Sequence, residues 1–285
     1  MEHYDILIIG GGAAGIAAAK ACRDCSVLLV DRREKLGGIL LQCLHRGFGK
    51  NKSGVEYAAD LLVDFPKGIP LALNTTVLNV TQKKTALLSG PETGRTEVSF
   101  SQLILASGCR EIPMGALPIA GTRPAGIYTA GQMQQMINLH GFLPEGPVLI
   151  LGSGDLGLIM ANQLADCGIP VTLVEQKSAC GGMAKNQACL HHPLVTLICG
   201  TTVLSVHGRK TLEGCTLSDR QFIPCKTLLI AAGLRPEREL IAGLEDRDWI
   251  HLCGNCSTVH PMVEGVVKEG NQAGMYAREK IRGSL

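Results

Sequence analysis

The sequence is poor in aromatic residues and nearly balanced in charge. Its 285 residues include 5 Phe, 4 Tyr and 1 Trp, and 27 basic side chains offset 25 acidic ones to leave a net charge of +2. This balance gives no field that favours nucleic acid or anionic lipid. No apolar run approaches the roughly 18 residues that span a bilayer, and the N-terminus lacks the basic start of a secretory signal. We therefore expect a cytoplasmic protein with no nucleic-acid partner and no integral membrane segment.

Glycine and cysteine, by contrast, are abundant, with 35 and 12 residues. Many glycines suit an enzyme with tight backbone turns around cofactors. The cysteines are scattered along a chain that can bury a substantial core, so most are expected to be small buried residues in a reducing compartment. Cys22/Cys25 and Cys253/Cys256 have C-x-x-C spacing. Because we expect them at opposite edges of one sheet, we predict no metal site.

The chain opens with a dinucleotide-binding pattern over residues 4–31. Apolar runs at 6–9 and 27–30 predict two strands, and Gly10-x-Gly12-x-x-Gly15 opens an Ala-rich helix between them. The glycines allow a tight turn and a close approach to a pyrophosphate, which the helix N-terminus attracts. Asp31 follows the second strand, where an acid accepts hydrogen bonds from a ribose hydroxyl.

Residues 148–175 repeat the whole pattern. Gly152-x-Gly154-x-x-Gly157 follows a strand over 148–151 and opens a helix, and a second strand ends at Glu175. Two complete copies predict two nucleotide sites. An acid at Glu175 suits the free 2′-hydroxyl of NAD and repels the 2′-phosphate of NADP, so we expect NAD(H) rather than NADP(H) at the second site.

The rest of the chain fits one domain interrupted by another. Residues 1–115 and 245–285 are predicted to form the first domain, and residues 116–244 the second. The fold class is therefore α/β with two Rossmann-like dinucleotide-binding domains, one inserted in the other. The remaining expected elements are a helix over 53–64 that a capping box opens, a strand over 103–106, a linker over 113–124, a helix over 132–139, strands over 228–231 and 248–252, and a helix over 261–281.

This layout resembles the pyridine nucleotide–disulfide oxidoreductases, which are flavoproteins with two dinucleotide sites. Ile104–Gly108 and Leu229–Gly233 resemble the strand-then-ATG motif that closes each domain of that family. Leu252–Asn255 resembles its late GD motif, with Asn255 in place of the acid that contacts the ribityl chain of the flavin. The resemblance implies FAD at the first site, NAD(H) at the second, and hydride transfer between them.

The resemblance also implies which residues hold the cofactors. The helix that starts near Pro261 would point its positive end at the flavin. For FAD the implied residues are Gly10, Gly12, Ala14, Gly15, Asp31, Arg32, Gly38, Gln42, Val77, Ser107, Gly108, Asn255, His260, Met262 and Val263. For NAD(H) they are Gly152, Gly154, Asp155, Leu156, Gly157, Glu175, Ala232 and Gly233.

Three segments resemble a subgroup of this family. Leu36–Gly49, Gly121–Gly126 and Gly152–Met160 look like segments of the FAD-dependent oxidoreductases that accompany anaerobic glycerol-3-phosphate dehydrogenases. The same group resembles the flavin subunits of opine oxidases and hydrogen cyanide synthases. This resemblance implies an oligomeric assembly, with a substrate-oxidising dehydrogenase and an iron–sulfur protein as partner subunits.

The cysteine pattern argues against a redox-active disulfide. The family's disulfide reductases carry two cysteines after the first Gly-Gly, or a C-x-x-C in the inserted domain. After Gly37-Gly38 this chain has only Cys43, with His45 close by, and the insert has no C-x-x-C. Cys43 as a thiolate near the flavin and His45 as a proton donor stay candidate catalytic residues. The alternative is a small buried cysteine and a structural histidine.

The sequence leaves three functions open. The first is an FAD-dependent oxidoreductase that passes hydride or electrons between NAD(H) and a second donor or acceptor, as part of a larger dehydrogenase assembly. The second is a stand-alone NADH oxidase or peroxidase that uses Cys43. The third is a non-catalytic subunit that holds a cofactor structurally, which the exchange of acid for Asn255 and the lack of a disulfide keep open.

Overall fold

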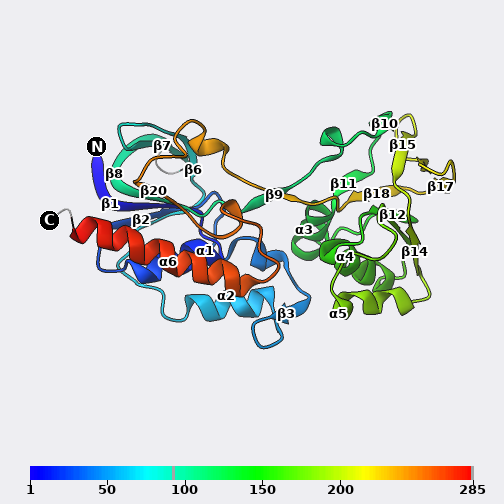
Figure 1. Cartoon of the computed structure of the whole chain (residues 1–285), viewed down its shortest axis with the longest axis horizontal. Coiled ribbons are helices and arrows are strands. Elements are labelled where there is room, and N and C mark those ends of the chain that lie inside the picture. The colour runs from blue at the N-terminus through cyan, green and yellow to red at the C-terminus, as the bar shows by residue number, and fades with distance from the viewer. Residues whose placement is uncertain (92–93, 284–285) are drawn as a thin grey trace. The chain divides into compact units, whose positions relative to one another are not determined.

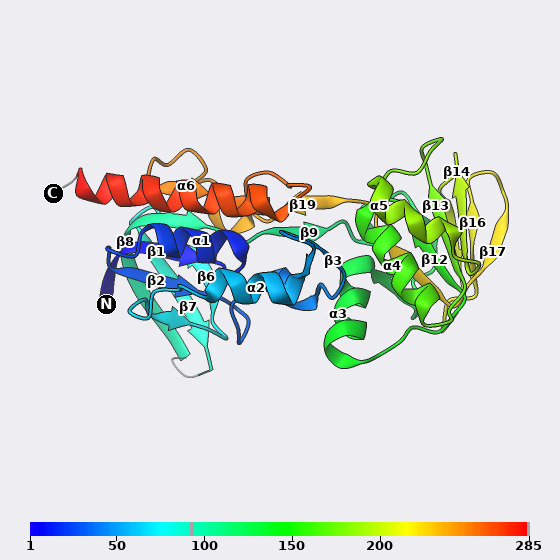
Figure 2. The same cartoon turned by 90° about the horizontal axis from the view of Figure 1, so that it is seen from below.

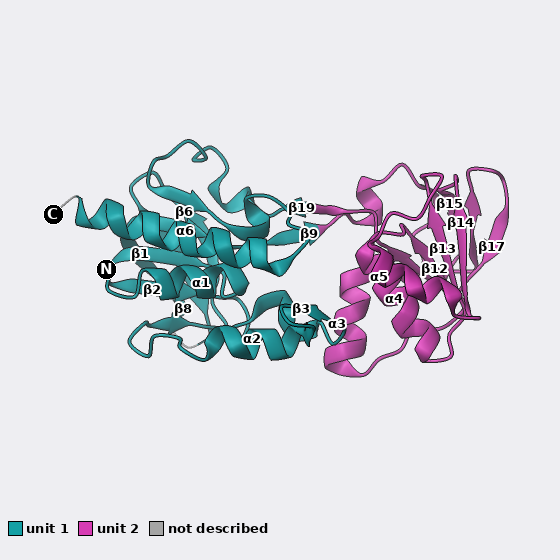
Figure 3. Ribbon diagram, turned by 60° about the horizontal axis from the view of Figure 1, so that its bottom comes forward, with its two compact units in different colours: residues 1–110, 235–285 teal, residues 111–234 magenta. Residues whose placement is uncertain are grey.

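The chain divides into two compact units, which Figure 3 shows in different colours. The computed structural model describes residues 1–91 and 94–283. Unit 1 consists of Met1–Arg110 and Arg235–Leu285, and unit 2 is Glu111–Leu234. The sequence predicted these junctions at 115/116 and 244/245. Two short strands carry the chain out of unit 1 and back, β9 (Cys109–Glu111) and β19 (Leu234–Pro236), and they pair with each other.

Unit 1 is built on a mostly parallel sheet. Its strands are β1 (Glu2–Ile9), β2 (Val27–Val30), β5 (Leu71–Ala72), β6 (Thr76–Val80), β7 (Thr85–Gly90), β8 (Gly94–Leu105) and β20 (Ile250–Leu252). Their order is β5-β2-β1-β8-β7-β6, with β20 paired to the end of β8. β1 runs parallel to both β2 and β8, whereas β7 is antiparallel to its neighbours. The carboxyl ends of the parallel strands β1, β8 and β20 therefore lie together on the same side of the sheet.

The helices of unit 1 are α1 (Ala13–Ala21), α2 (Gly54–Leu62) and α6 (Val263–Arg282). Figures 1 and 2 show α6 beside α1, although α6 comes from the far end of the chain. The approach is close because α6 presents glycines: a Cβ on Gly270 would lie 2.2 Å from the Ala14 carbonyl oxygen, and one on Gly274 would lie 2.3 Å from that of Ala18. The capping box predicted for α2 is confirmed, since Ser53 and Glu56 exchange both hydrogen bonds.

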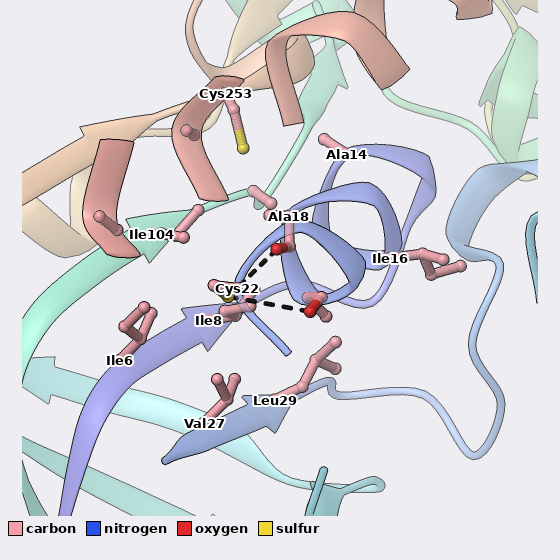
Figure 4. Close-up of a cluster of buried hydrophobic side chains, with 14 of the residues drawn as sticks. Ile6, Ile8, Ala14, Ile16, Ala18, Cys22, Val27, Leu29, Ile104 and Cys253 are labelled. Carbon is pink, nitrogen blue, oxygen red and sulfur yellow. Dashed lines mark hydrogen bonds between the residues drawn. The ribbon is translucent and has the colours of Figure 1, made fainter. Parts of the chain in front are cut away.

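The core of unit 1 between sheet and helices is made of small and branched apolar side chains. Ile6, Ile8 and Ile104 from the sheet belong to the same buried cluster as Ile16 from α1 (Figure 4). Cys22 belongs to this cluster and donates its thiol to the carbonyl oxygen of Ala18 over 3.1 Å. Burial raises the pKa of Cys22 to about 12. Its role here is therefore that of a small apolar residue.

Unit 2 contains two sheets. The first holds β11 (Ile127–Thr129), β12 (Val148–Leu151), β13 (Val171–Glu175), β14 (Val195–Cys199) and β18 (Thr227–Ile230), and the second holds β10 (Ala120–Gly121), β15 (Val203–His207), β16 (Gly214–Leu217) and β17 (Phe222–Pro224). The first sheet is all parallel, in the order β11-β18-β12-β13-β14. The helices are α3 (Ala130–His140), α4 (Asp155–Asp166) and the short α5 (Ala184–Gln187).

The segment 113–124 is part of unit 2, so the prediction of a linker there is wrong. Met114 and Ile119 are each only 6% exposed and belong to the core between the two sheets. Ala120–Gly121 also pairs with β15 as the edge strand β10. The segment is too short and irregular to show a hydrophobic periodicity. Its burial depends instead on strands that lie far along the chain, so the sequence pattern does not reveal it.

Smaller elements complete the two units. They are β3 (Arg46–Phe48), β4 (Lys52–Ser53) and the single 3-10 turns at Gly38–Gln42, Met114–Ala116, Ala188–His191, Glu239–Ile241 and Gly254–Cys256. Among the described residues, no helix combines the length and apolar character needed to cross a membrane. Within the same residues, no group of three or more His, Cys, Asp or Glu side chains could hold a metal ion.

Candidate functional site

In unit 1 the chain passes from β1 into α1 through three glycines with different surroundings. Gly10 has a φ of +110°, and a Cβ there would lie 2.3 Å from the Ala106 carbonyl oxygen. A Cβ on Gly15 would lie 1.8 Å from the carbonyl oxygen of Gly10. At Gly12 the nearest atom would be the Cα of Gly38, 3.9 Å away. The first and third glycines are thus required by packing of the chain on itself, whereas Gly12 keeps space open where α1 begins.

The turn in unit 2 divides these tasks in the same way. Gly152 has a φ of +108°, and a Cβ there would lie 2.4 Å from the carbonyl oxygen of Ala231. A Cβ on Gly157 would lie 2.2 Å from the carbonyl oxygen of Gly152, while Gly154 has no atom within 4 Å of that position. Gly12 and Gly154 are the N-caps of α1 and α4, and neither helix has a side-chain cap there. Each helix therefore begins at a clear space with uncapped N–H groups, which fits a pyrophosphate.

The acid that follows each second strand is held by hydrogen bonds. Asp31 accepts the N–H of Gly11 on Oδ2 over 2.5 Å and that of Arg33 on Oδ1 over 2.7 Å. Asp31 as a whole is 9% exposed. It is therefore fixed against the glycine turn of unit 1.

Glu175 is held in a similar way but accepts one more hydrogen bond. Its Oε2 accepts both the N–H and the hydroxyl of Ser153, over 2.9 and 2.7 Å, and its Oε1 accepts the N–H of Lys177 over 3.0 Å. Burial raises the pKa of Glu175, but these hydrogen bonds and the Lys177 charge outweigh it, so the pKa lies below its usual range. The side chain is therefore a carboxylate at neutral pH. Ser153 is a site residue that the sequence analysis missed.

A Gly-Gly pair follows the acid at the same spacing in both units, which the sequence analysis did not notice. Gly37 donates its N–H to the Gly11 carbonyl oxygen over 2.8 Å. Gly181 donates its N–H to the hydroxyl of Ser153 over 2.9 Å. In each unit the loop after the acid therefore returns to the glycine turn. The repeated acid and Gly-Gly spacing is the signal that would have found both loops.

Predicted FAD residues also gather where β8 and β20 end. The Ser107 hydroxyl donates to the Glu237 carbonyl oxygen over 2.6 Å, and Gly108 has a φ of +79°. Asn255 accepts the N–H of His260 on Oδ1 over 3.0 Å. His260 Nε2 in turn lies 3.0 Å from the Oε1 of Glu269. The side-chain oxygen of Asn255 thus holds the segment that leads into α6, and its Nδ2 donates to the Sγ of Cys109 over 3.6 Å.

The remaining predicted residues are more dispersed. Arg32 and Met262 are exposed, Gln42 is buried, and Val77 lies on the edge strand β6, which β7 and β8 separate from β1. Their assignments to FAD stay predictions, as do those of the other cofactor residues. Gly38 lies opposite Gly12, Ala14 lies in α1, Val263 opens α6, Leu156 lies in the first turn of α4, and Ala232 and Gly233 follow β18.

Asp155, at the start of α4, binds the loop that follows Glu175. Its Oδ1 accepts the N–H of Met183 over 2.8 Å and the amide of Asn186 over 2.7 Å. The Asp155 carboxylate therefore already accepts hydrogen bonds from protein groups beside the glycine turn of unit 2. Asn186, like Ser153, is absent from the residues that the sequence predicted.

Cys43 is buried, with 8% exposure, and its thiol donates to the Ile39 carbonyl oxygen over 3.4 Å. Burial raises the pKa of this thiol to about 12, which disfavours a thiolate at neutral pH. His45 is half-buried and its ring packs against Phe48 with 5.2 Å between the centroids. The geometry gives Cys43 the environment of a packing residue.

Two of the cysteines in unit 2 bring their Sγ atoms close together. Cys215 and Cys225 lie 4.0 Å apart, on β16 and directly after β17. Both are buried in the core between the two sheets of unit 2, on the side of the four-stranded sheet. Cys253 and Cys256 are also fully buried, and Cys253 shares the core cluster of Cys22.

Comparison with known proteins gives one family. The family model described as pyridine nucleotide-disulphide oxidoreductase matches residues 4–263. An opine oxidase subunit of Agrobacterium tumefaciens is 31% identical over 59% of this chain and 36% of its own length. The hydrogen cyanide synthase subunit HcnB of Pseudomonas protegens is 31% identical over 71% of this chain and 45% of its own length. The chain thus spans less than half of either relative.

A solved structure agrees in fold. Thioredoxin reductase of T. acidophilum superposes with a TM-score of 0.78 over 98% of this chain and 99% of that one, at 18% identity. At this identity the likeness concerns the fold alone. It confirms the predicted α/β class with two Rossmann-like dinucleotide-binding units, one inserted in the other.

Proposed function

The chain belongs to the pyridine nucleotide-disulphide oxidoreductase family, and from this we propose that it is an FAD-dependent oxidoreductase that passes hydride or electrons between NAD(H) and a second donor or acceptor. The observation that carries the proposal is the repeated turn. Gly12 and Gly154 each leave open space at the start of a helix, and a buried acid lies beside each turn. One such turn would bind one dinucleotide, so two imply a pair that exchange electrons.

Unit 1 is the proposed FAD site. The turn at Gly10–Gly15 and the N-terminus of α1 would bind the pyrophosphate, and Asp31 a ribose. Nδ2 of Asn255 has two N–H groups, of which one donates to Cys109 Sγ and the other would serve a ribityl hydroxyl, while Oδ1 holds the backbone before α6. Bound FAD would supply the two-electron chemistry, and the task of these residues is to bind and orient it. The N-terminus of α6, which spans 20 residues, would stabilise negative charge there.

Unit 2 is the proposed NAD(H) site. The turn at Gly152–Gly157 and the N-terminus of α4 would bind the pyrophosphate. The ionised Glu175 would accept a hydrogen bond from the adenosine 2′-hydroxyl and repel a phosphate in its place. Lys177 contacts this acid through its backbone N–H. We therefore propose NAD(H) rather than NADP(H) as the nicotinamide nucleotide.

The proposed reaction uses no redox-active disulfide. Cys43 has a thiol whose pKa burial raises to about 12, so the geometry favours this function over a Cys43-dependent oxidase or peroxidase. Cys215 and Cys225 are buried on a sheet that does not carry the glycine turn. The non-catalytic alternative is supported by Asn255, which stands where the family resemblance implies an acid, and by the lack of a cysteine pair at the positions where the family's disulfide reductases carry one.

The relatives support a role within a larger assembly. Both of the relatives described above are named as subunits, one of an opine oxidase and one of a hydrogen cyanide synthase. We propose that this chain likewise acts in an oligomeric assembly, with a substrate-oxidising dehydrogenase and an iron–sulfur protein as partners. Such partners would supply the substrate and the second electron carrier.

The decisive experiment is an anaerobic absorbance spectrum of the purified chain before and after addition of NADH. We expect oxidised-flavin bands that bleach with NADH. Gly12→Val and Gly154→Val are matched variants, because both replace the glycine that faces open space. The first is expected to lose the flavin bands, and the second to keep them but resist bleaching by NADH.

Other outcomes would contradict the proposal in distinct ways. Flavin bands that neither NADH nor NADPH bleaches, alone or with partner proteins present, would favour the non-catalytic alternative. A Gly12→Val protein that folds and stays yellow would mean that the first turn does not hold FAD.

A further inference from the structure

The loop at residues 176–183, which follows Glu175, is tied to the second glycine turn through a buried serine. Gly181 donates its N–H to the hydroxyl oxygen of Ser153 over 2.9 Å, and that hydroxyl donates to Oε2 of Glu175 over 2.7 Å. Ser153 is 0% exposed. Its hydroxyl hydrogen is committed to the carboxylate and its oxygen to the loop, so the three groups form one hydrogen-bonded chain.

The same loop has a second tie to the start of α4. Oδ1 of Asp155 accepts the N–H of Met183 and the side-chain amide of Asn186, over 2.8 and 2.7 Å. A Cβ on Gly182 would lie 2.4 Å from Leu158 Cδ1, so the backbone rests directly on α4. The loop is therefore held at two points of the glycine turn, Ser153 and Asp155, and the Ser153 hydroxyl couples it to Glu175.

Unit 1 has no counterpart of the serine hydroxyl. The residue between its first two glycines is Gly11, which holds Asp31 through its backbone N–H alone. The loop after Asp31 returns to the turn by a bond between Gly37 N–H and the carbonyl oxygen of Gly11, which does not involve the acid. In unit 1 the acid and the loop are thus linked through the backbone of Gly11, whereas in unit 2 they are linked through one side-chain hydroxyl, which donates to the acid and accepts from the loop.

The hydrogen bonds of Glu175 decide what it can offer a ligand. A carboxylate has about four acceptor positions, and Ser153 N–H, the Ser153 hydroxyl and Lys177 N–H occupy three of them. The position that remains is on Oε1. This fits a single ribose hydroxyl, and the fixed carboxylate cannot turn away from a phosphate placed there.

We propose that Ser153 is a positioning residue that makes the second site selective for an unphosphorylated ribose, by fixing the Glu175 carboxylate and coupling it to the loop at 176–183. The inference rests on the proposed nucleotide site of unit 2 and names the side chain that sets its selectivity. Because the Ser153 side chain is fully buried, it acts through Glu175 and the loop rather than by touching the ligand.

The test is isothermal titration calorimetry of the full chain with two probes, ADP-ribose and 2′-phospho-ADP-ribose. Two variants remove the hydroxyl: Ser153→Ala, and Ser153→Gly, which gives unit 2 the residue that unit 1 has. We expect ADP-ribose to bind about tenfold more weakly to both and the preference over the phosphorylated probe to fall by about tenfold, since a hydrogen bond to a charged group is lost. Ser153→Thr, which keeps a hydroxyl, should retain most of the preference.

Two controls make the outcomes distinct. Gly154→Val should abolish the signal and so assign it to unit 2, and Ser205→Ala, which removes a hydroxyl from β15, should change nothing. A wild-type chain that binds neither probe, or prefers the phosphorylated one, would overturn both the proposed NAD(H) site and this inference. A wild-type preference that persists undiminished in folded Ser153→Ala or Ser153→Gly protein would overturn the inference alone.

Discussion

The two glycine turns of this protein have the same backbone arrangement and differ in how the neighbouring acid is held. In both, packing of the chain on itself requires the first and third glycines, and the second faces open space. Asp31 is held by backbone N–H groups only, whereas Glu175 also accepts the hydroxyl of Ser153. The comparison separates two requirements. The turn itself follows from glycine and chain packing, while the position of the acid in unit 2 also depends on the side chain of Ser153.

The largest expected effect comes from substituting a glycine that is packed against the chain, compared with the same substitution at a glycine that faces open space. Gly157→Ala places a Cβ 2.2 Å from the Gly152 carbonyl oxygen and should lower the free energy of unfolding by about 3 kcal/mol or more. Gly154→Ala meets nothing within 4 Å and should cost less than about 1 kcal/mol. Denaturant unfolding of both variants measures the contrast. Equal losses would contradict the division of tasks between these glycines.

The next effect is a loss of stability at acidic pH, which we expect to arise from a buried histidine in unit 1. Burial, and to a smaller extent the Lys280 charge, lower the pKa of His251 from 6.5 to about 4, against a weaker opposing effect of Asp248. Its Nε2 also bonds the Gln102 side chain over 2.9 Å. Between these two values the unfolded chain binds more protons, so the stability that neutral His251 gives above pH 6.5 is lost as the pH falls towards 4.

The expected loss is up to about 3 kcal/mol, and urea unfolding at pH 7 and pH 4.5 measures it. His251→Gln removes the titrating ring and should reduce the difference in the free energy of unfolding between pH 7 and pH 4.5. His207→Gln, which replaces an exposed histidine in unit 2, is the matched control and should leave the difference as it is. An unchanged pH dependence in His251→Gln would mean that other groups cause the acid sensitivity.

The acids themselves give a third contrast. Glu175→Ala should reduce the preference for NADH over NADPH by roughly tenfold to a hundredfold, because it removes a charged acceptor that repels phosphate. Asp31→Ala should leave this ratio intact and instead weaken retention of FAD. Steady-state kinetics with both nucleotides and the flavin content of purified protein measure the two effects. A ratio that Glu175→Ala leaves unchanged would contradict NAD(H) selection by this residue.

The smallest effect is expected at Cys43. Its buried thiol bonds the Ile39 carbonyl oxygen, and a serine hydroxyl can make the same bond. Cys43→Ser should therefore change neither the extent nor the rate of flavin bleaching by NADH by more than about twofold. Stopped-flow absorbance under anaerobic conditions measures this. Loss of bleaching would favour the oxidase or peroxidase alternative that depends on Cys43.

The sequence alone predicts the two turns because their determinants are local. A strand, three glycines, a helix and an acid lie within one short segment, and the same is true of the capping box at Ser53 and Glu56. The segment 113–124 could not be predicted in this way. Met114 and Ile119 are buried by strands that lie far along the chain, and no periodicity marks them as core.

The candidate site divides similarly. The glycines and acids follow from spacing, and the repeated Gly-Gly pair was also readable from the sequence. Contacts such as Glu269 with the N–H of Gly254, over 2.8 Å, were not. Glu269 lies within α6, where a charged residue ordinarily faces solvent, and only the packed helix brings it to the turn after β20. The role of Ser153 could not be predicted because serine is common in turns, and its partner Glu175 lies 22 residues further along the chain, after a helix and a strand.

The close packing of α6 on α1 sets the order in which the protein can be completed during synthesis. Gly270 and Gly274 place α6 against the backbone of Ala14 and Ala18, and α6 follows unit 2 along the chain. Unit 2 is continuous and can fold as soon as it leaves the ribosome. Unit 1 must wait for α6 with one face of α1 uncovered, so the newly made chain acquires a folded inserted unit before its first unit is finished.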